Sequence, residues 1–166
     1  MSETLPATEA HAPFMMRALE LAQQAATLGE VPVGAVVVFE GVIVGEGFNR
    51  RETHKDPLAH AEMRAIGDAA ERLGRWRLSG CTLYVTLEPC PMCAGALVNS
   101  RIDHLVFGAR DPKAGAVVSL YRLVNDSRLN HGMSVLEGVL SDASASLLKK
   151  FFQQRRIENK ASKKNP

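Results

Sequence analysis

Two short stretches of this sequence carry side chains that can act together chemically. His60-Ala61-Glu62 supplies an imidazole and a carboxylate, and Pro89-Cys90-Pro91-Met92-Cys93 supplies two thiolates. One imidazole and two thiolates can hold a zinc ion, and three protein ligands leave the fourth position of a catalytic zinc open for water. The carboxylate of Glu62 need not touch the metal, and it is then free to move protons. The pattern predicts a catalytic zinc on His60, Cys90 and Cys93.

Each half of this pattern has other interpretations when it is taken alone. A C-x-x-C pair also occurs in redox sites and as half of a structural zinc site, and a single histidine at a helix start is often a surface or capping residue. A structural zinc would normally need a fourth ligand, and the sequence has no obvious one. Cys81 begins an apolar strand and is expected to pack there, and His54, His104 and His131 lack ligand spacing. The catalytic zinc is therefore the favoured interpretation.

The elements that must position these residues alternate between helix and strand. Apolar spacing and turn residues predict a β-hairpin near the N-terminus, followed by alternating helices and strands. Such a pattern favours a three-layer α/β/α sandwich around a five-stranded mixed sheet. Two predicted helices begin at the two motifs, so their N-termini should meet in a cleft at the ends of neighbouring strands. The expected helices are Pro13–Leu28, Ala59–Leu73, Pro91–Asn99 and one starting near Asp142 after Ser141, and the expected strands are Val33–Phe39, Val42–Phe48, Cys81–Glu88, His104–Ala109 and Ser134–Leu140.

The bulk properties fit one globular domain. The chain has 166 residues, of which 46% are hydrophobic and 23% are charged, and no apolar run approaches the roughly 20 residues that span a bilayer. Residues 1–12 have neither a basic start nor an apolar core, so we expect a disordered lead-in rather than a secretory signal. Three cysteines, two of them in a C-x-x-C, favour metal or redox chemistry over a structural disulfide, and a cytoplasmic location.

The net charge of +2 is unevenly distributed. From Lys149 onward the chain has seven basic residues and one acidic residue, whereas the preceding part has 13 basic and 17 acidic residues, so the end carries +6 and the body −4. A basic end on an acidic body is typical of a phosphate-binding patch. It is equally compatible with the solvated end of a helix, where cations are favourable.

Taken together, the blocks of this sequence resemble the bacterial tRNA-specific adenosine deaminases, zinc enzymes of the cytidine deaminase-like superfamily that form inosine at the wobble position of an anticodon. H-x-E with P-C-x-x-C is the known signature of zinc nucleobase deaminases. A member of the family that this sequence resembles is an established example of an enzyme that flips its target base out of the stack. The resemblance extends from about Phe14 to Lys160. The matching blocks are EVPVGAVVV (30–38), GEGFNR (45–50), DPLAHAEMRAI (56–66), TLYVTLEPCPMCAGA (82–96), VFGARDPKAGA (106–116) and FFQQRR (151–156).

The resemblance implies one cytidine/deoxycytidylate deaminase-type domain over residues 1–166, with a basic tail at 157–166. It implies one zinc per subunit on His60, Cys90 and Cys93, with Glu62 as the catalytic proton shuttle, and a homodimer acting on the anticodon stem-loop of tRNA with no membrane association. The implied substrate and RNA contacts are Asn49 reading the flipped base, Pro32, Val33, Val36 and Ala61 around the pocket, Ala109, Arg110 and Asp111 beside the flanking nucleotides, and Phe152, Arg155 and Arg156 on the stem-loop.

Two competing functions remain open. Deaminases of free guanine or cytosine share the H-x-E and P-C-x-x-C core, so the core does not choose the substrate; Asn49, the GARDPKAGA block and the basic end favour tRNA. A non-catalytic RNA-binding module with a structural zinc would need neither Glu62 nor an open metal position, and both features argue against it.

Overall fold

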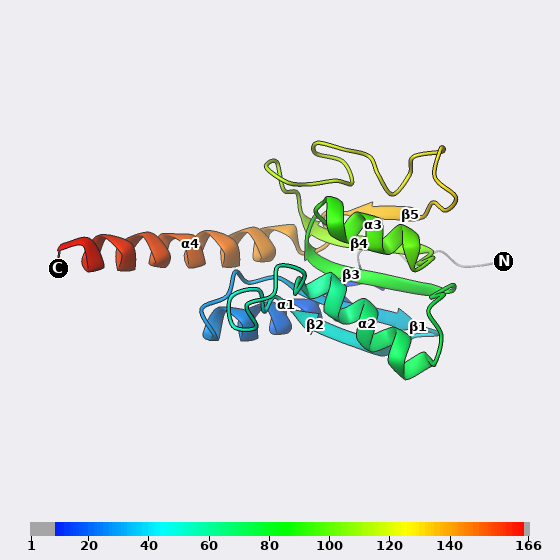
Figure 1. The fold of residues 1–166 in the computed structure, drawn as a ribbon, viewed down its shortest axis with the longest axis horizontal. Coiled ribbons are helices and arrows are strands. Elements are labelled where there is room, and N and C mark those ends of the chain that lie inside the picture. The colour runs from blue at the N-terminus through cyan, green and yellow to red at the C-terminus, as the bar shows by residue number, and fades with distance from the viewer. Residues whose placement is uncertain (1–8, 165–166) are drawn as a thin grey trace.

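The computed structural model describes residues 9–164, which form four helices and a five-stranded sheet (Figure 1). The sheet has the strand order β2-β1-β3-β4-β5. Strands β2 and β3 pair antiparallel with β1, whereas β4 pairs parallel with β3 and β5 parallel with β4. The elements are α1 (Ala12–Thr27), β1 (Gly34–Phe39), β2 (Val42–Phe48), α2 (Ala61–Leu73), β3 (Cys81–Leu87), α3 (Pro91–Asn99), β4 (His104–Ala109), β5 (Ser134–Glu137) and α4 (Ser141–Lys164).

The opening hairpin follows from its turn. Glu40 and Gly41 both have positive φ angles, 51° and 77°, as the two central residues of a type I′ turn require. This turn pairs Phe39 with Val42 and sets the register of the β1–β2 pair, which shifts once between Val37 and Val38. The predicted hairpin is confirmed.

Helices cover both faces of the sheet, as predicted for a three-layer sandwich. Helices α2 and α3 pack on the face that carries Ala35, Val37, Leu83 and Val85. The opposite face carries Val36, Val38, Tyr84 and Val106 under α1, and α4 contacts β4 there. Strand β1 is buried along nearly its whole length because it is covered on both faces.

Several predicted boundaries move by a few residues. Strand β5 ends at Glu137 rather than Leu140, because Gly138 and Leu140 adopt positive φ angles in the turn into α4. Of the predicted lead-in, residues 1–8 lie outside the described part of the chain. The rest of that prediction is wrong: residues 9–11 form a turn, and the His11 ring holds it to the sheet, with Nδ1 2.7 Å from the Tyr84 hydroxyl oxygen.

The C-terminal helix extends well beyond the body of the protein. After Phe151 every described residue of α4 is exposed, and Figure 1 shows the helix running away from the sheet. The predicted basic tail is thus a continuation of α4 as far as Lys164. Within residues 9–164, no helix combines the length and the apolar character that a membrane crossing demands.

Candidate metal centre and substrate pocket

The two sequence motifs lie at the N-termini of α2 and α3. His60 is the N-cap residue of α2 and Cys90 is the N-cap residue of α3, both with extended backbone, and Cys93 lies in the first turn of α3. N-cap side chains commonly bond to their own helix, but neither His60 nor Cys90 does so. Their side chains are therefore free to bind something else.

The three side chains converge on one point. Nδ1 of His60 lies 3.6 Å from Sγ of Cys90 and 3.4 Å from Sγ of Cys93, and all three atoms lie within 4.8 Å of one another. Tetrahedral zinc, with bonds of about 2.3 Å to sulfur and about 2.0 Å to nitrogen, places sulfur and nitrogen ligands about 3.6 Å apart. The donor atoms thus have the chemistry and the spacing that a zinc ion requires.

Hydrogen bonding makes Cys90 the thiol of this pair that ionises more readily. A hydrogen bond from the Cys93 thiol, assisted by one from His60, lowers the pKa of Cys90 despite its partial burial. The same hydrogen bond raises the pKa of Cys93, because that thiol holds the shared proton. A thiolate at a helix N-terminus is the form of cysteine that binds a metal ion.

Glu62 completes the centre without belonging to the group of possible ligands. It lies in the first turn of α2, its side chain is buried, and it lines the same pocket as His60 and Cys90. Burial raises the pKa of Glu62, since the charged form loses its hydration. A carboxyl group with a raised pKa beside a metal position is suited to accept and return protons.

A pocket of about 200 Å³ opens beside this cluster. It is smaller than the roughly 300–1,000 Å³ of pockets for drug-sized ligands, so it suits a small group. The pocket contains four of the predicted contact residues together with His60, Glu62 and Cys90 of the predicted centre. It is lined by Val31, Val33, Asn49, Arg51, His60, Ala61, Glu62, Leu87, Glu88, Cys90, Asp111 and Ala114.

Asn49 is held by its neighbours at the wall of this pocket. Its Nδ2 donates to the carbonyl of Val31 at 3.2 Å, and its Oδ1 accepts from the backbone N–H of Arg51 at 3.1 Å. An amide side chain has two N–H donors and two lone pairs. One donor and one lone pair of Asn49 therefore stay available for a bound group.

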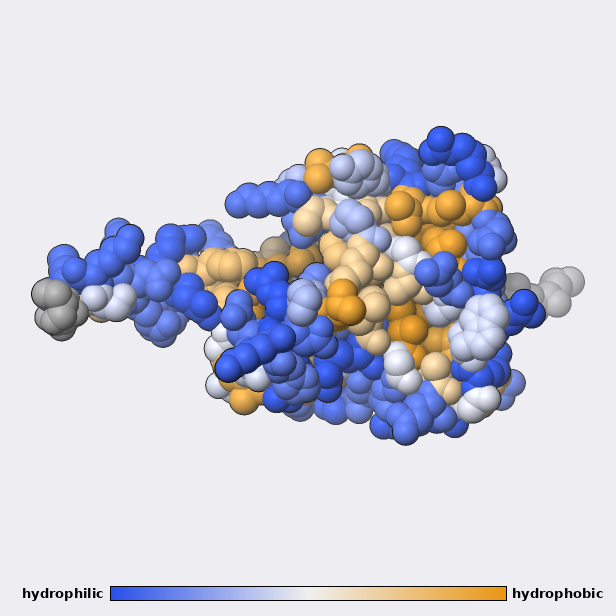
Figure 2. Space-filling view, viewed as in Figure 1, coloured by the Kyte–Doolittle hydropathy of each residue, from blue (hydrophilic) through white to orange (hydrophobic). Residues whose placement is uncertain are grey.

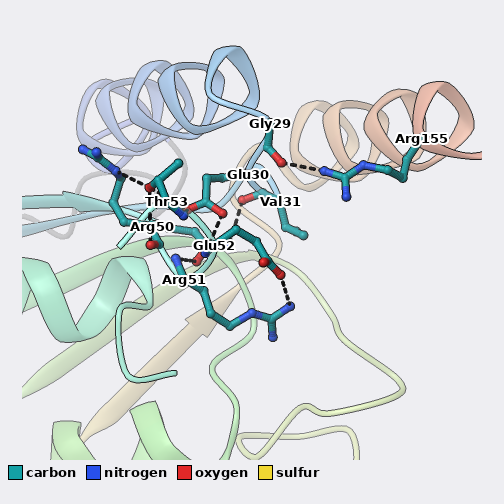
Figure 3. A network of polar contacts seen from close by, with 9 residues as sticks. Gly29, Glu30, Val31, Arg50, Arg51, Glu52, Thr53 and Arg155 are labelled. Carbon is teal, nitrogen blue, oxygen red and sulfur yellow. Dashed lines mark hydrogen bonds and ion pairs between the residues drawn. The ribbon is translucent and has the colours of Figure 1, made fainter. Parts of the chain in front are cut away.

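A buried acid that the sequence reading missed supports this wall. Glu30 has no exposed side-chain surface, and its carboxylate accepts from the N–H of Glu52 at 3.0 Å, the N–H of Thr53 at 3.3 Å and the hydroxyl of Thr53 at 3.1 Å (Figure 3). These bonds fix the segment that contains Arg51. The only sequence signal was an acid three residues before the predicted apolar strand Val33–Phe39.

Glu88 is a second pocket residue that the sequence reading missed. Burial alone would raise its pKa, but hydrogen bonds from the Ser119 hydroxyl and from backbone N–H groups of Val118, Ser119 and Asp111 outweigh burial and lower the pKa to about 2. Its carboxylate is therefore ionised and bound to the connection after β4.

Several predicted contacts lie elsewhere. The prediction for Val36 is wrong, because its side chain points to the α1 face of the sheet, opposite the pocket. Pro32 and Ala109 lie close in sequence to residues that line the pocket, but they do not line it themselves. Arg110 is exposed and forms an ion pair with Glu137, with 2.7 Å between Nη2 and Oε1.

The predicted contacts on α4 lie apart from the pocket lining. Nη2 of Arg155 donates to the carbonyl of Gly29 at 2.6 Å (Figure 3), and its guanidinium lies 5.0 Å from the Phe151 ring centroid. Phe152 and Arg156 are exposed to solvent. Arg155 therefore ties α4 to the segment that carries Glu30, while its neighbours face outward.

Comparison with known proteins matches this chain to deaminases. The model of the MafB19-like deaminase family matches residues 9–156. The tRNA-specific adenosine deaminase of Bacillus subtilis is 49% identical over 152 residues, which are 92% of this chain and 94% of that protein.

Two solved structures extend the comparison. A tRNA:A34 deaminase that edits A to I at the wobble position of transfer RNA has a TM-score of 0.79 and 44% identity, covering 82% of this chain and 99% of that one. The guanine deaminase of Bacillus subtilis has a TM-score of 0.58 and 42% identity, covering 60% of this chain and 64% of that one.

Proposed function

This chain belongs to the MafB19-like deaminase family, among the tRNA-specific adenosine deaminases, and on this premise we propose that it converts adenosine to inosine at the wobble position of a tRNA anticodon. The net reaction consumes one water and releases one ammonia. The observation that carries the proposal is the buried Glu62, which shares one pocket with His60 and Cys90, whose donor atoms cluster with that of Cys93.

We propose that these three donors hold one zinc ion in each subunit, because their spacing fits a tetrahedral zinc. The bound ion would supply a Lewis acid that makes water reactive at neutral pH. Glu62 accepts a proton from the attacking water, and delivers protons to N1 of adenine and to the departing amino group. The free donor and lone pair of Asn49 face the bound base and orient it.

The substrate is proposed to be an RNA loop for two reasons. The pocket has room for one base, and a base in a single-stranded loop is cheap to unstack. The exposed part of α4 carries the cations Arg156, Lys160, Lys163 and Lys164, which can reach phosphates beyond the pocket. Binding of the anticodon stem-loop by α4 is therefore part of the proposal.

The enzyme is also proposed to act as a homodimer in the cytoplasm. Figure 2 shows apolar side chains along the face that carries α3, and the adjoining connection exposes about half of the side chains of Leu120 and Tyr121. Large exposed apolar patches mark interaction sites. The cytoplasm holds tRNA and keeps thiols such as those of Cys90 and Cys93 reduced. Mass measurement by light scattering tests the dimer, and a monomer at micromolar concentration would contradict it.

One experiment tests the function directly. Zinc-loaded protein is incubated with total tRNA, and inosines are mapped as guanosine after reverse transcription. We expect inosine at wobble adenosines, and in parallel no ammonia from free guanine or cytosine. Ammonia from guanine without inosine would establish the free-base alternative, and no product from any substrate would favour an RNA-binding module.

A further inference from the structure

Glu88 immediately precedes the Pro89-Cys90 motif, but its carboxylate serves another part of the chain. Its side chain is 2% exposed and it is not among the metal-binding donors. Oε1 accepts from the N–H of Asp111 at 3.0 Å and from the hydroxyl of Ser119 at 2.5 Å. Oε2 accepts from the N–H groups of Val117 at 3.1 Å, Val118 at 2.9 Å and Ser119 at 3.0 Å. Five donors from residues 111–119 therefore surround one carboxylate.

The segment 111–119 is also closely packed against the Glu88 side chain, most tightly at Gly115. A Cβ atom on Gly115 would lie 2.3 Å from Cδ of Glu88, so only glycine fits there. Backbone bonds support the arrangement, with the N–H of Glu88 donating to the Ala109 carbonyl at 2.8 Å and the N–H of Ala116 donating to the Pro89 carbonyl at 2.8 Å. The segment is thus wrapped around the carboxylate.

This segment forms one wall of the substrate pocket. Asp111 and Ala114 line the pocket, and the N–H of Asp111 is one of the groups that Glu88 binds. Asp111 in turn organises the next turn, because its Oδ1 accepts from the N–H groups of Lys113 at 3.0 Å and Ala114 at 3.2 Å. The position of the wall therefore depends on Glu88.

We propose that Glu88 is a positioning residue that holds residues 111–119 as the pocket wall and thereby sets which nucleotides are accepted beside the target base. The statement about nucleotides rests on the proposed function, whereas the anchoring of the wall does not. Glu88 performs this task through four backbone N–H donors and the Ser119 hydroxyl, and it takes no part in the proposed proton transfers.

The variant Glu88→Gln should remove one specific hydrogen bond, the one that the Asp111 N–H donates to the carboxylate. Three N–H groups face Oε2, so the amide oxygen takes that position and the amide nitrogen replaces Oε1. The Ser119 hydroxyl can rotate to accept from this nitrogen, but the N–H of Asp111 cannot, and it loses its acceptor. The loss falls at the pocket end of the segment.

Hydrogen exchange and kinetics measure the consequence. In Glu88→Gln we expect the Asp111 amide to exchange about ten to a hundred times faster, with zinc content unchanged. With an anticodon stem-loop we expect KM to rise about tenfold while kcat changes little, and discrimination against substituted nucleotides beside the target to fall.

Two further variants keep the proposal falsifiable. Ser119→Ala removes one bond to the same oxygen but leaves all four backbone N–H bonds, so we expect it to behave like the parent. Gly115→Ala leaves the carboxylate intact but pushes the segment off it, so it should raise exchange and KM as Glu88→Gln does, even if Glu88→Gln fails to fold.

The outcomes separate the anchoring from the function. Unchanged exchange over residues 111–119 in both Glu88→Gln and Gly115→Ala, or a fall in kcat or zinc content with KM unchanged, would overturn the positioning role. If the parent protein forms no inosine, the proposed function fails and the claim about flanking nucleotides falls with it. The exchange comparison would then still decide whether Glu88 anchors the wall.

Discussion

Replacing Gly47 by alanine should displace the helix that carries His60 and Glu62. Gly47 lies on β2 directly beneath the first turns of α2, which packs against the strand backbone at this point. A Cβ atom there would lie 2.5 Å from the Ala61 carbonyl oxygen and 2.8 Å from the Ala65 nitrogen. Both atoms belong to the helix backbone, so no side-chain rotation can relieve the overlap.

The size of the displacement follows from the overlap. Restoring an ordinary separation of about 3.4 Å moves the helix by about 0.9 Å. Metal sites accept ligand distances within about 0.2 Å of their preferred values. The shift therefore takes the His60 imidazole out of range of Cys90 and Cys93, and overpacking of this kind typically destabilises a protein by about 1–3 kcal/mol.

Three measurements on Gly47→Ala test this reasoning. We expect zinc content by elemental analysis to fall well below one per chain, and Tm to fall by about 2–12 °C, as a protein of this size loses about 2–4 °C per kcal/mol. Turnover should fall about a hundredfold or more, since a misplacement of about 1 Å can have that effect. Gly67→Ala is the matched control on the same helix, because its Cβ would meet no atom within 4 Å, and it should stabilise the helix by up to about 1 kcal/mol.

Full zinc content and an unchanged Tm in Gly47→Ala would refute the argument that the close approach of α2 to β2 positions His60. A lower Tm with full zinc content would refute only the link between helix position and metal binding.

Three further predictions concern the centre and α4. Glu62→Ala should keep its zinc and its fold but lose about 10²–10⁴-fold in turnover, measured as inosine formed per zinc-loaded chain, because the proton shuttle is gone; near-normal turnover would disprove that role. Cys90→Ser should lose zinc, because a neutral hydroxyl replaces the thiolate, and equal zinc in variant and parent by elemental analysis would contradict the ligand assignment. Joint replacement of Arg156 and Lys160 by alanine should weaken the salt dependence of stem-loop binding. The slope of log K against log salt concentration should become shallower by about 0.7–0.9 for each phosphate that the helix no longer binds. An unchanged slope would mean that α4 ends as a solvated helix.

The sequence predicted what depends on neighbours along the chain. Proline at the start of α3, the Gly74 C-cap of α2 and the Glu40-Gly41 turn are local signals, and the elements they bound were found within a few residues. The convergence of His60, Cys90 and Cys93 was also predicted, because those residue types have few other uses at that spacing. The family resemblance added the pocket residue Asn49, which no local pattern indicates.

Tertiary structure decided which side chains share a space. The face of Val36 could not be predicted, because β1 is apolar on both sides and its own pattern does not say which side α1 covers. Glu30 and Glu88 read as ordinary acids, since the backbone donors that bury them come from segments 22 to 31 residues away. Hydrophobic periodicity reports burial within one element, but the partner of a buried charge is set only when distant segments meet. The sequence therefore determined which residue types can act together at the centre, and the fold determined which residues form the pocket walls around them.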